Sequence, residues 1–269
     1  MSNLPFVEIN WPDRPAMVNV LSTTRGGGVS TAPYGDGQGG GGLNLGTHVG
    51  DDAAAVAHNR ALLQRHLPTE PIWLRQVHGT RVLHADATAE SMPQSISASV
   101  PELAPESIEA DACMATRAGV VCTIMTADCM PVLLADSQGR AVGAAHAGWR
   151  GLAAGVLQQA VNAMRRAGAD QISAWLGPGI GPQAFEVGAD VLAAFSSWGD
   201  SARAAFVPLP DQPGKYLADL PALARLALAG VGVQRVSGGE HCTFSDAARF
   251  YSFRRERTTG RMASMIWLS

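Results

Sequence analysis

Residues 126–151 read TADCMPVLLADSQGRAVGAAHAGWRG, and they contain two short apolar segments, 131–135 and 141–145. Such segments, bounded by turn residues, are typical of buried strands. If they form a hairpin with its turn on Ser137 and Gln138, Ala135 lies opposite Arg140 and Cys129 faces His146. Facing Cβ atoms lie about 4.5–5.5 Å apart. A thiolate and an imidazole at that separation can share one metal ion.

The sequence around this hairpin predicts further strands and helices. Residues 112–116 and 119–127 are strand-like, and residues 149–167 carry the apolar stripe of a helix that ends before Gly168. Farther along, the patterns predict strands at 172–176, 233–236, 250–253 and 263–268, and helices at 188–197 and 220–229. Strands mixed with helices at uneven spacing favour an α+β fold with mixed β-sheets and flanking helices.

The first 109 residues predict strands, a helix and two loops, and two of the strands cover 72–77 and 81–85. An earlier strand covers 17–23, and Asp51 can cap a helix over 52–66. Residues 35–42 read GDGQGGGG, which predicts a mobile surface loop that does not pack. Residues 88–109 are rich in Ala, Ser, Pro and Glu and predict a second loop or insertion.

Composition narrows the classes of protein. The 269 residues are 46% hydrophobic and 16% charged, which predicts a globular chain, and a net charge of −3 argues against a nucleic-acid partner. No apolar run reaches the ~18 residues that span a bilayer, and the N-terminus lacks a signal-peptide pattern. The four cysteines form no CxxC pair. We therefore expect a soluble cytoplasmic protein without a membrane partner.

A third metal ligand accompanies the Cys129 and His146 pair. His78 in RQVHG ends its own strand-like segment and is the best-placed further histidine. A His, Cys, His set gives zinc three protein ligands and leaves a fourth position for water, which is the catalytic pattern. Two other interpretations stay open, since an isolated cysteine beside a strand is usually a core residue and the same pair suits a cysteine hydrolase.

The motif HAGWRG, residues 146–151, leads from a strand through Gly148 into the predicted helix. Free backbone N–H groups and the positive end of the helix dipole would lie beside His146. The sequence thus predicts an anion pocket next to the metal, although an ordinary strand-to-helix turn has the same pattern.

Five motifs in this order resemble the YfiH-like family, also called the laccase-domain or multicopper polyphenol oxidase family. They are RQVHG (75–79), TADCMPVLLAD (126–136), HAGWRG (146–151), LGPGIGP (176–182) and FYSFRRERTTGRMAS (250–264). The resemblance implies one layered domain over 1–269, with zinc bound by His78, Cys129 and His146 as the catalytic centre. Only the loops near 35–42 and 88–109 depart from the family pattern.

The resemblance also implies an activity. It points to phosphorolysis of adenosine, inosine, guanosine and methylthioadenosine, and to hydrolytic deamination of adenosine. Oxidation of polyphenols by copper-loaded members accounts for the older family name. Oxidases of that type need several metal centres supplied by many histidines, whereas this chain has seven in all. The residues therefore favour nucleoside chemistry at one zinc, with copper as a substitute metal.

Several residues near the motifs are candidate contacts for phosphate or purine. They are Arg25, Asn44, Arg75 and Arg150, and Cys113 is a candidate for the pocket wall. Each arginine also suits a solvated surface, and Cys113 suits the core. We expect the other histidines, His48 among them, to be structural or exposed, and the RRER run at 254–257 to form a solvated face.

Two further functions stay open. Some bacterial members of the resembled family are thought to edit peptidoglycan precursors. A non-catalytic module that binds nucleosides or a partner is the remaining class, and it would bind without turnover.

The metal hypothesis makes the first testable prediction. The purified protein should retain about one zinc per chain after desalting, and a chelator should abolish its activity. Cys129→Ala should lose both metal and activity while remaining folded, as measured by metal analysis and circular dichroism. Activity that survives chelation but not alkylation would identify a thiol hydrolase instead.

Overall fold

The computed structural model describes residues 4–91 and 108–269. Its centre is a six-stranded mixed sheet in the order β14-β10-β8-β9-β6-β4. These strands are β4 (Val82–His84), β6 (Ala112–Ala115), β8 (Met130–Asp136), β9 (Val142–Ala147), β10 (Ile172–Leu176) and β14 (Arg235–Gly238). Every residue of β8 and β9 is buried. Burial on both faces explains why these strands are continuously apolar rather than alternating.

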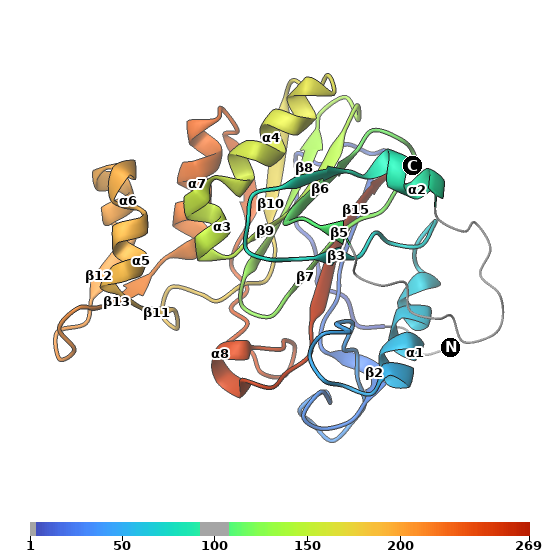
Figure 1. Cartoon of the computed structure of the whole chain (residues 1–269), viewed down its shortest axis with the longest axis horizontal. Coiled ribbons are helices and arrows are strands. Elements are labelled where there is room, and N and C mark those ends of the chain that lie inside the picture. Colours follow the sequence, from blue (N-terminus) through green and yellow to red (C-terminus); the bar gives the residue numbers. More distant parts are fainter. Residues whose placement is uncertain (1–3, 92–107) are drawn as a thin grey trace.

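Helices cover one face of this sheet, and a second sheet covers the other (Figure 1). Helices α3 (Trp149–Ala154), α4 (Val156–Arg166) and α7 (Leu220–Gly230) pack on one face. A three-stranded sheet packs on the other and consists of β1 (Val18–Ser22), β15 (Met262–Leu268) and β7 (Cys122–Thr126). The expected α+β fold with mixed sheets and flanking helices is confirmed.

Smaller elements complete the described chain. A third sheet of β11 (Glu186–Gly188), β13 (Lys215–Ala218) and β12 (Phe206–Pro208) lies with α5 (Ala189–Ala194) and α6 (Asp200–Arg203) at one end of the molecule (Figure 1). The others are β2 (Gly26–Ser30), α1 (Ala53–Gln64), β3 (Leu74–Arg75), α2 (Ala85–Ser91), β5 (Ile108–Glu109), a 3₁₀ turn (Ser196–Trp198) and α8 (Phe253–Glu256). No helix in the described ranges has the length and apolar character to cross a membrane.

The central hairpin forms, but its register differs from the expected one by two residues. Pro131 pairs with His146 and Ala135 with Val142, and Asp136 N donates a hydrogen bond to Ala141 O, so the loop has four residues, 137–140, rather than two. The buried Asp136 carboxylate explains the longer loop, because it accepts hydrogen bonds from the backbone N–H groups of Gln138 and Arg140. A shift of two residues leaves every side chain on the same face. Cys129 and His146 therefore still meet.

Three other expectations need correction. The helix predicted over 149–167 is two helices, because Gly155 between α3 and α4 has φ 98°. The strand predicted at 250–253 is absent from that segment; Ser252 instead caps α8 by accepting a hydrogen bond from Arg255 N. Asp52, rather than Asp51, caps α1.

The structure describes the first of the two predicted loops and only the ends of the second. Both ends of the glycine run are packed: Gly35 and Gly42 are buried, and a Cβ on Gly42 would lie 1.8 Å from the carbonyl oxygen of Tyr34. The expectation that this segment does not pack is therefore wrong at its ends, while its mobility stays a prediction. Most of the second loop, residues 92–107, lies outside the described residues.

The Asp136 network makes a prediction about stability. Although burial raises the pKa of this carboxyl, hydrogen bonds from Arg140 and from backbone N–H groups lower it to about 2. A carboxyl with a lowered pKa in the folded protein stabilises it above the unfolded pKa of about 3.9, and this contribution disappears as the pH falls toward 2. Asp136→Asn should cost about 2 kcal/mol of unfolding free energy at pH 7.

Urea unfolding of both proteins between pH 7 and pH 3 measures this difference. It should shrink below about pH 4. The exposed Asp211→Asn is the control and should unfold like the wild type at every pH. A difference for Asp136→Asn that does not vary with pH would contradict the interpretation.

Candidate metal centre

The antiparallel pairing of β8 and β9 brings the start of one strand and the end of the other to the same edge of the sheet. Cys129 directly precedes β8, His146 lies in β9, and His78 follows β3. One ligand atom from each residue lies within 4.8 Å of the others. Cys129 Sγ is 3.6 Å from His78 Nε2. The structure therefore assembles the three residues that the sequence nominated.

A buried carboxylate positions both histidines. Asp111 is 0% exposed and accepts hydrogen bonds from the backbone N–H groups of Val77, His78 and Gly79, at 3.2, 2.8 and 2.7 Å. It also lies 2.9 Å from His146 Nδ1. When Nδ1 carries the proton, the other ring nitrogen is free to bind a metal, an arrangement usual at metal-ligating histidines. The sequence analysis did not identify Asp111, which stands two residues before the candidate Cys113.

A glutamine fixes the same loop from its other side. Gln76 Oε1 accepts a hydrogen bond from Met125 N, and Gln76 Nε2 donates one to Met125 O, both at 2.8 Å. The side-chain amide thus pairs with β7 as a neighbouring strand would. The loop that carries His78 is held by side chains rather than by its short strand.

The charges of the ligands suit a metal. Burial raises the pKa of the Cys129 thiol, but His146 and His78 together lower it to about 6. Burial lowers the pKa of His146, whereas the Cys129 thiolate and Asp111 raise it to about 9. The pair therefore favours a thiolate beside an imidazolium at neutral pH, and metal binding would release the imidazolium proton. One thiolate and two imidazoles, with a carboxylate behind one of them, fit zinc or copper.

The three ligands open into a cavity of about 540 Å³. Its apolar wall consists of Met125, Trp149, Ile180, Phe185 and Phe253, and its cationic wall consists of Arg150, Arg254, Arg257 and Arg261. An aromatic wall beside fixed positive charges can hold a flat ring and an anion together.

Backbone strain gathers at this cavity. In the described chain, the non-glycine residues with positive φ are His78 at 61°, Asp128 at 91° and Arg257 at 58°. All three line the cavity. Conformations of this kind cost of order 1–3 kcal/mol each and occur preferentially at functional sites.

Four of the five candidate substrate contacts lie elsewhere. The buried Arg25 donates to the carbonyl oxygens of Gly35 and Ala247 and pairs with Glu256. Arg75 is exposed and pairs with Glu109. Cys113 is 0% exposed in β6. None of them lines the cavity, and Arg150 is the arginine candidate that does.

Asn44 affects the cavity only through a neighbouring residue. It is buried, and its Oδ1 accepts hydrogen bonds from the backbone N–H groups of Gly46 and Arg261. It therefore holds the backbone of a residue that lines the cavity, without lining it itself.

Three arginines and one histidine of the cavity were not predicted from the sequence, namely Arg254, Arg257, Arg261 and His48. Arg254 and Arg257 line the cavity, so the RRER segment is not simply a solvated face, and His48 lines it as well. Arg255 turns inward and donates to the carbonyl oxygens of Thr243 and Phe250. No local pattern signals Arg254 and Arg257, because α8 has only four residues and Arg257 follows it with a φ of 58°.

The start of the predicted helix packs against the candidate metal ligands, and the anion pocket expected there stays a prediction. A Cβ on Gly148 would lie 2.8 Å from both Cys129 Sγ and His78 Cδ2, and α3 has only six residues. The glycine is needed for close packing of the metal ligands.

Fold and site together define a layered α+β protein with a His, Cys, His centre in a cavity. The sequence matches the family described as multi-copper polyphenol oxidoreductase laccase over residues 19–269. The chain belongs to this family, and the predicted resemblance to YfiH-like proteins is confirmed.

Similar proteins span nearly the whole chain. A purine nucleoside phosphorylase of Pseudomonas aeruginosa is 49% identical over 259 residues, which cover 96% of each chain. The purine nucleoside phosphorylase YfiH of Escherichia coli is 46% identical over 260 residues, also 96% of each. The crystal structure of a Neisseria meningitidis protein of family DUF152 superimposes with a TM-score of 0.84 at 44% identity, covering 98% of this chain and 99% of that one.

The packing of Gly148 makes a prediction about metal affinity. Gly148→Ala should push Cys129 and His78 apart and weaken zinc binding by about tenfold or more, a size typical of altered ligand positioning. A competitive titration with a zinc chelator measures the affinity. Gly230→Ala is the matched control, because no other atom lies within 4 Å of a Cβ there. Wild-type affinity in Gly148→Ala would show that this glycine does not shape the site.

Proposed function

We propose that this protein is a zinc-dependent purine nucleoside phosphorylase that acts on adenosine, inosine, guanosine and methylthioadenosine and also deaminates adenosine. The observation that carries the proposal is the convergence of His78, Cys129 and His146 in a cavity that has both aromatic and arginine walls. The names of the similar proteins support the phosphorylase activity in this proposal. The cytoplasmic location and the lack of a nucleic-acid partner stay predictions.

His78, Cys129 and His146 would hold the metal, which supplies Lewis-acid chemistry when bound. In phosphorolysis the bond from ribose C1′ to the purine nitrogen breaks, and C1′ bonds to a phosphate oxygen. The products are the free base and ribose 1-phosphate, or methylthioribose 1-phosphate when the substrate is methylthioadenosine. Arg150 lines the cavity and would bind and orient the phosphate. Phe185 and Phe253 provide apolar surface for the base and limit the access of water to C1′.

The ligand count favours this reaction over polyphenol oxidation. Within the residues that the structure describes, one cluster of histidine, cysteine and carboxylate ligands has metal-binding spacing. An oxidase of the laccase type needs several copper centres. One centre instead suits zinc, with copper as a substitute metal.

A cysteine hydrolase is the second candidate. Its support is the order Cys129, His146, Asp111, in which a thiol of lowered pKa adjoins an imidazole that a carboxylate orients. The comparison of chelation with alkylation separates it from the zinc enzyme.

A nucleoside panel tests the proposal. Zinc-loaded protein is incubated with adenosine, inosine, guanosine or methylthioadenosine, with and without phosphate, and the products are separated by chromatography. Base release that requires phosphate is expected, with inosine formed from adenosine as the second product. Cys129→Ala should give only background. If no substrate is converted above that control, the nucleoside function is wrong and the hydrolase becomes the leading candidate.

A further inference from the structure

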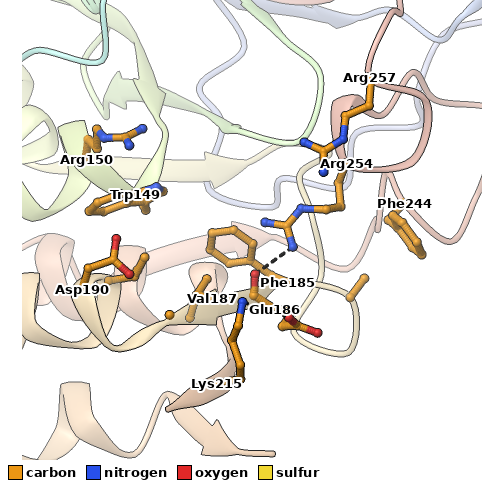
Figure 2. A pocket seen from close by; sticks show the side chains of 13 residues that line it. Trp149, Arg150, Phe185, Glu186, Val187, Asp190, Lys215, Phe244, Arg254 and Arg257 are labelled. Atoms are coloured by element: carbon orange, nitrogen blue, oxygen red, sulfur yellow. Dashed lines mark hydrogen bonds and ion pairs between the residues drawn. The ribbon is translucent and has the colours of Figure 1, made fainter. Parts of the chain in front are cut away.

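A second hollow adjoins the metal cavity. It encloses about 680 Å³ and shares Trp149, Arg150, Phe185, Arg254 and Arg257 with the cavity. Figure 2 shows Trp149 and Arg150 on one side of this hollow and Arg254 and Arg257 on the other. We call it the arginine groove. Its shared residues lie at the junction between the two spaces.

Positive charge dominates the arginine groove. Four cations, Arg150, Lys215, Arg254 and Arg257, face two carboxylates, Glu186 and Asp190. Lys215 Nζ lies 3.3 Å from Glu186 Oε1, so that pair is largely neutral. Among the described residues, no carboxylate lies within ion-pair distance of Arg150, Arg254 or Arg257. The three guanidinium groups at the junction therefore have no ion-pair partner in the described part of the chain, and the Asp128 carboxylate that lines the metal cavity already accepts hydrogen bonds from Arg254 N and Thr243 Oγ1.

Hydrogen bonds fix Arg254 relative to the candidate metal ligands. Asp128, the neighbour of Cys129, accepts hydrogen bonds at 2.6 Å from Arg254 N and from Thr243 Oγ1. Arg254 Nη1 donates to the carbonyl oxygen of Glu186 at 2.7 Å, which leaves most of its donors toward the hollow (Figure 2). Arg257 extends its side chain from a backbone at φ 58°, where glycine would be less strained.

We propose that Arg254 and Arg257 form a binding site for a phosphoryl dianion at the junction of the metal cavity and the arginine groove, with Arg150 on the opposite wall. A planar guanidinium with several parallel N–H donors matches the oxygens of a phosphoryl group. Two such groups on one wall and one across from them surround an anion of this size. The assignment of inorganic phosphate as the natural ligand rests on the proposed phosphorolysis.

The size of the groove allows two sources for the phosphoryl group. Inorganic phosphate fills a small part of 680 Å³ and would sit next to a nucleoside in the metal cavity. A nucleoside 5′-monophosphate would place its own phosphoryl group at the junction. Both ligands need the same two arginines, and the kinetics separate them.

The test combines direct binding with kinetics on the zinc-loaded, full-length protein. Arg257→Gln removes an exposed side chain with no hydrogen-bond partner among the described residues, so its fold should persist. Arg254→Gln and Arg254→Lys form the second pair, and the lysine should retain part of the affinity. Arg117→Gln is the matched control, since it removes a guanidinium that pairs with Glu90 away from both hollows.

Calorimetric titration with inorganic phosphate at constant ionic strength is the first measurement. Each glutamine variant should weaken binding by about tenfold or more, because a charge-assisted hydrogen bond is lost, whereas the control should bind like the wild type. In inosine phosphorolysis the KM for phosphate should rise by a similar factor with the KM for inosine nearly unchanged. If inosine 5′-monophosphate reacts better than inosine and Arg257→Gln removes that advantage, the phosphoryl group of an ester is the ligand.

The outcomes separate this inference from the proposed function. Wild-type phosphate affinity in both glutamine variants, with no advantage for the monophosphate, overturns the anion site even if phosphorolysis is found. Phosphate binding that both variants lose, in a protein that releases no base, overturns phosphorolysis and leaves the anion site standing.

Discussion

The geometry of the candidate metal centre depends on the Asp111 carboxylate. Its two oxygens receive three backbone N–H groups from the loop of His78 and face the ring of His146, so one buried charge fixes ligands that are 68 positions apart in the chain. Burial raises the pKa of this carboxyl, but the bond to His146 and the backbone bonds outweigh that effect and lower it. Asp111 therefore stays ionised near neutral pH, and its charge keeps His146 protonated on the nitrogen that faces away from the metal position.

Close packing also holds the three ligand residues in place. Gly148 leaves room for the ligand side chains, and a Cβ on Gly151 would lie 3.0 Å from the carbonyl oxygen of Gly79. The sheet edge, the loop of His78 and the start of α3 thus meet at van der Waals distance. Three ligand residues held this tightly need little rearrangement to bind a metal. The main free-energy cost of metal binding is then the release of the His146 proton.

The hairpin shows why much of the site was predictable and where prediction ended. A register error of two residues kept Cys129 and His146 on one face, because side chains alternate with period two. Periodicity could not find Arg254 or Arg257, since a helix of four residues is too short to show a pattern. The position of Arg254 depends on a hydrogen bond to Asp128, more than a hundred positions earlier, and no local pattern reports such a contact. The break at Gly155 was missed because the apolar stripe continues across it.

The charges of α8 explain how one short segment serves both the fold and the cavity. Glu256 pairs with Arg25 and Arg255, and Arg255 binds the carbonyl oxygens of the preceding loop. The only carboxylate of this turn is therefore used on the side away from the metal. Its other two arginines face the cavity without an ion-pair partner in the described part of the chain. Arginines of one short segment therefore have different roles: Arg255 stabilises the fold, whereas Arg254 and Arg257 line the cavity. The neighbouring groups of each arginine determine its role.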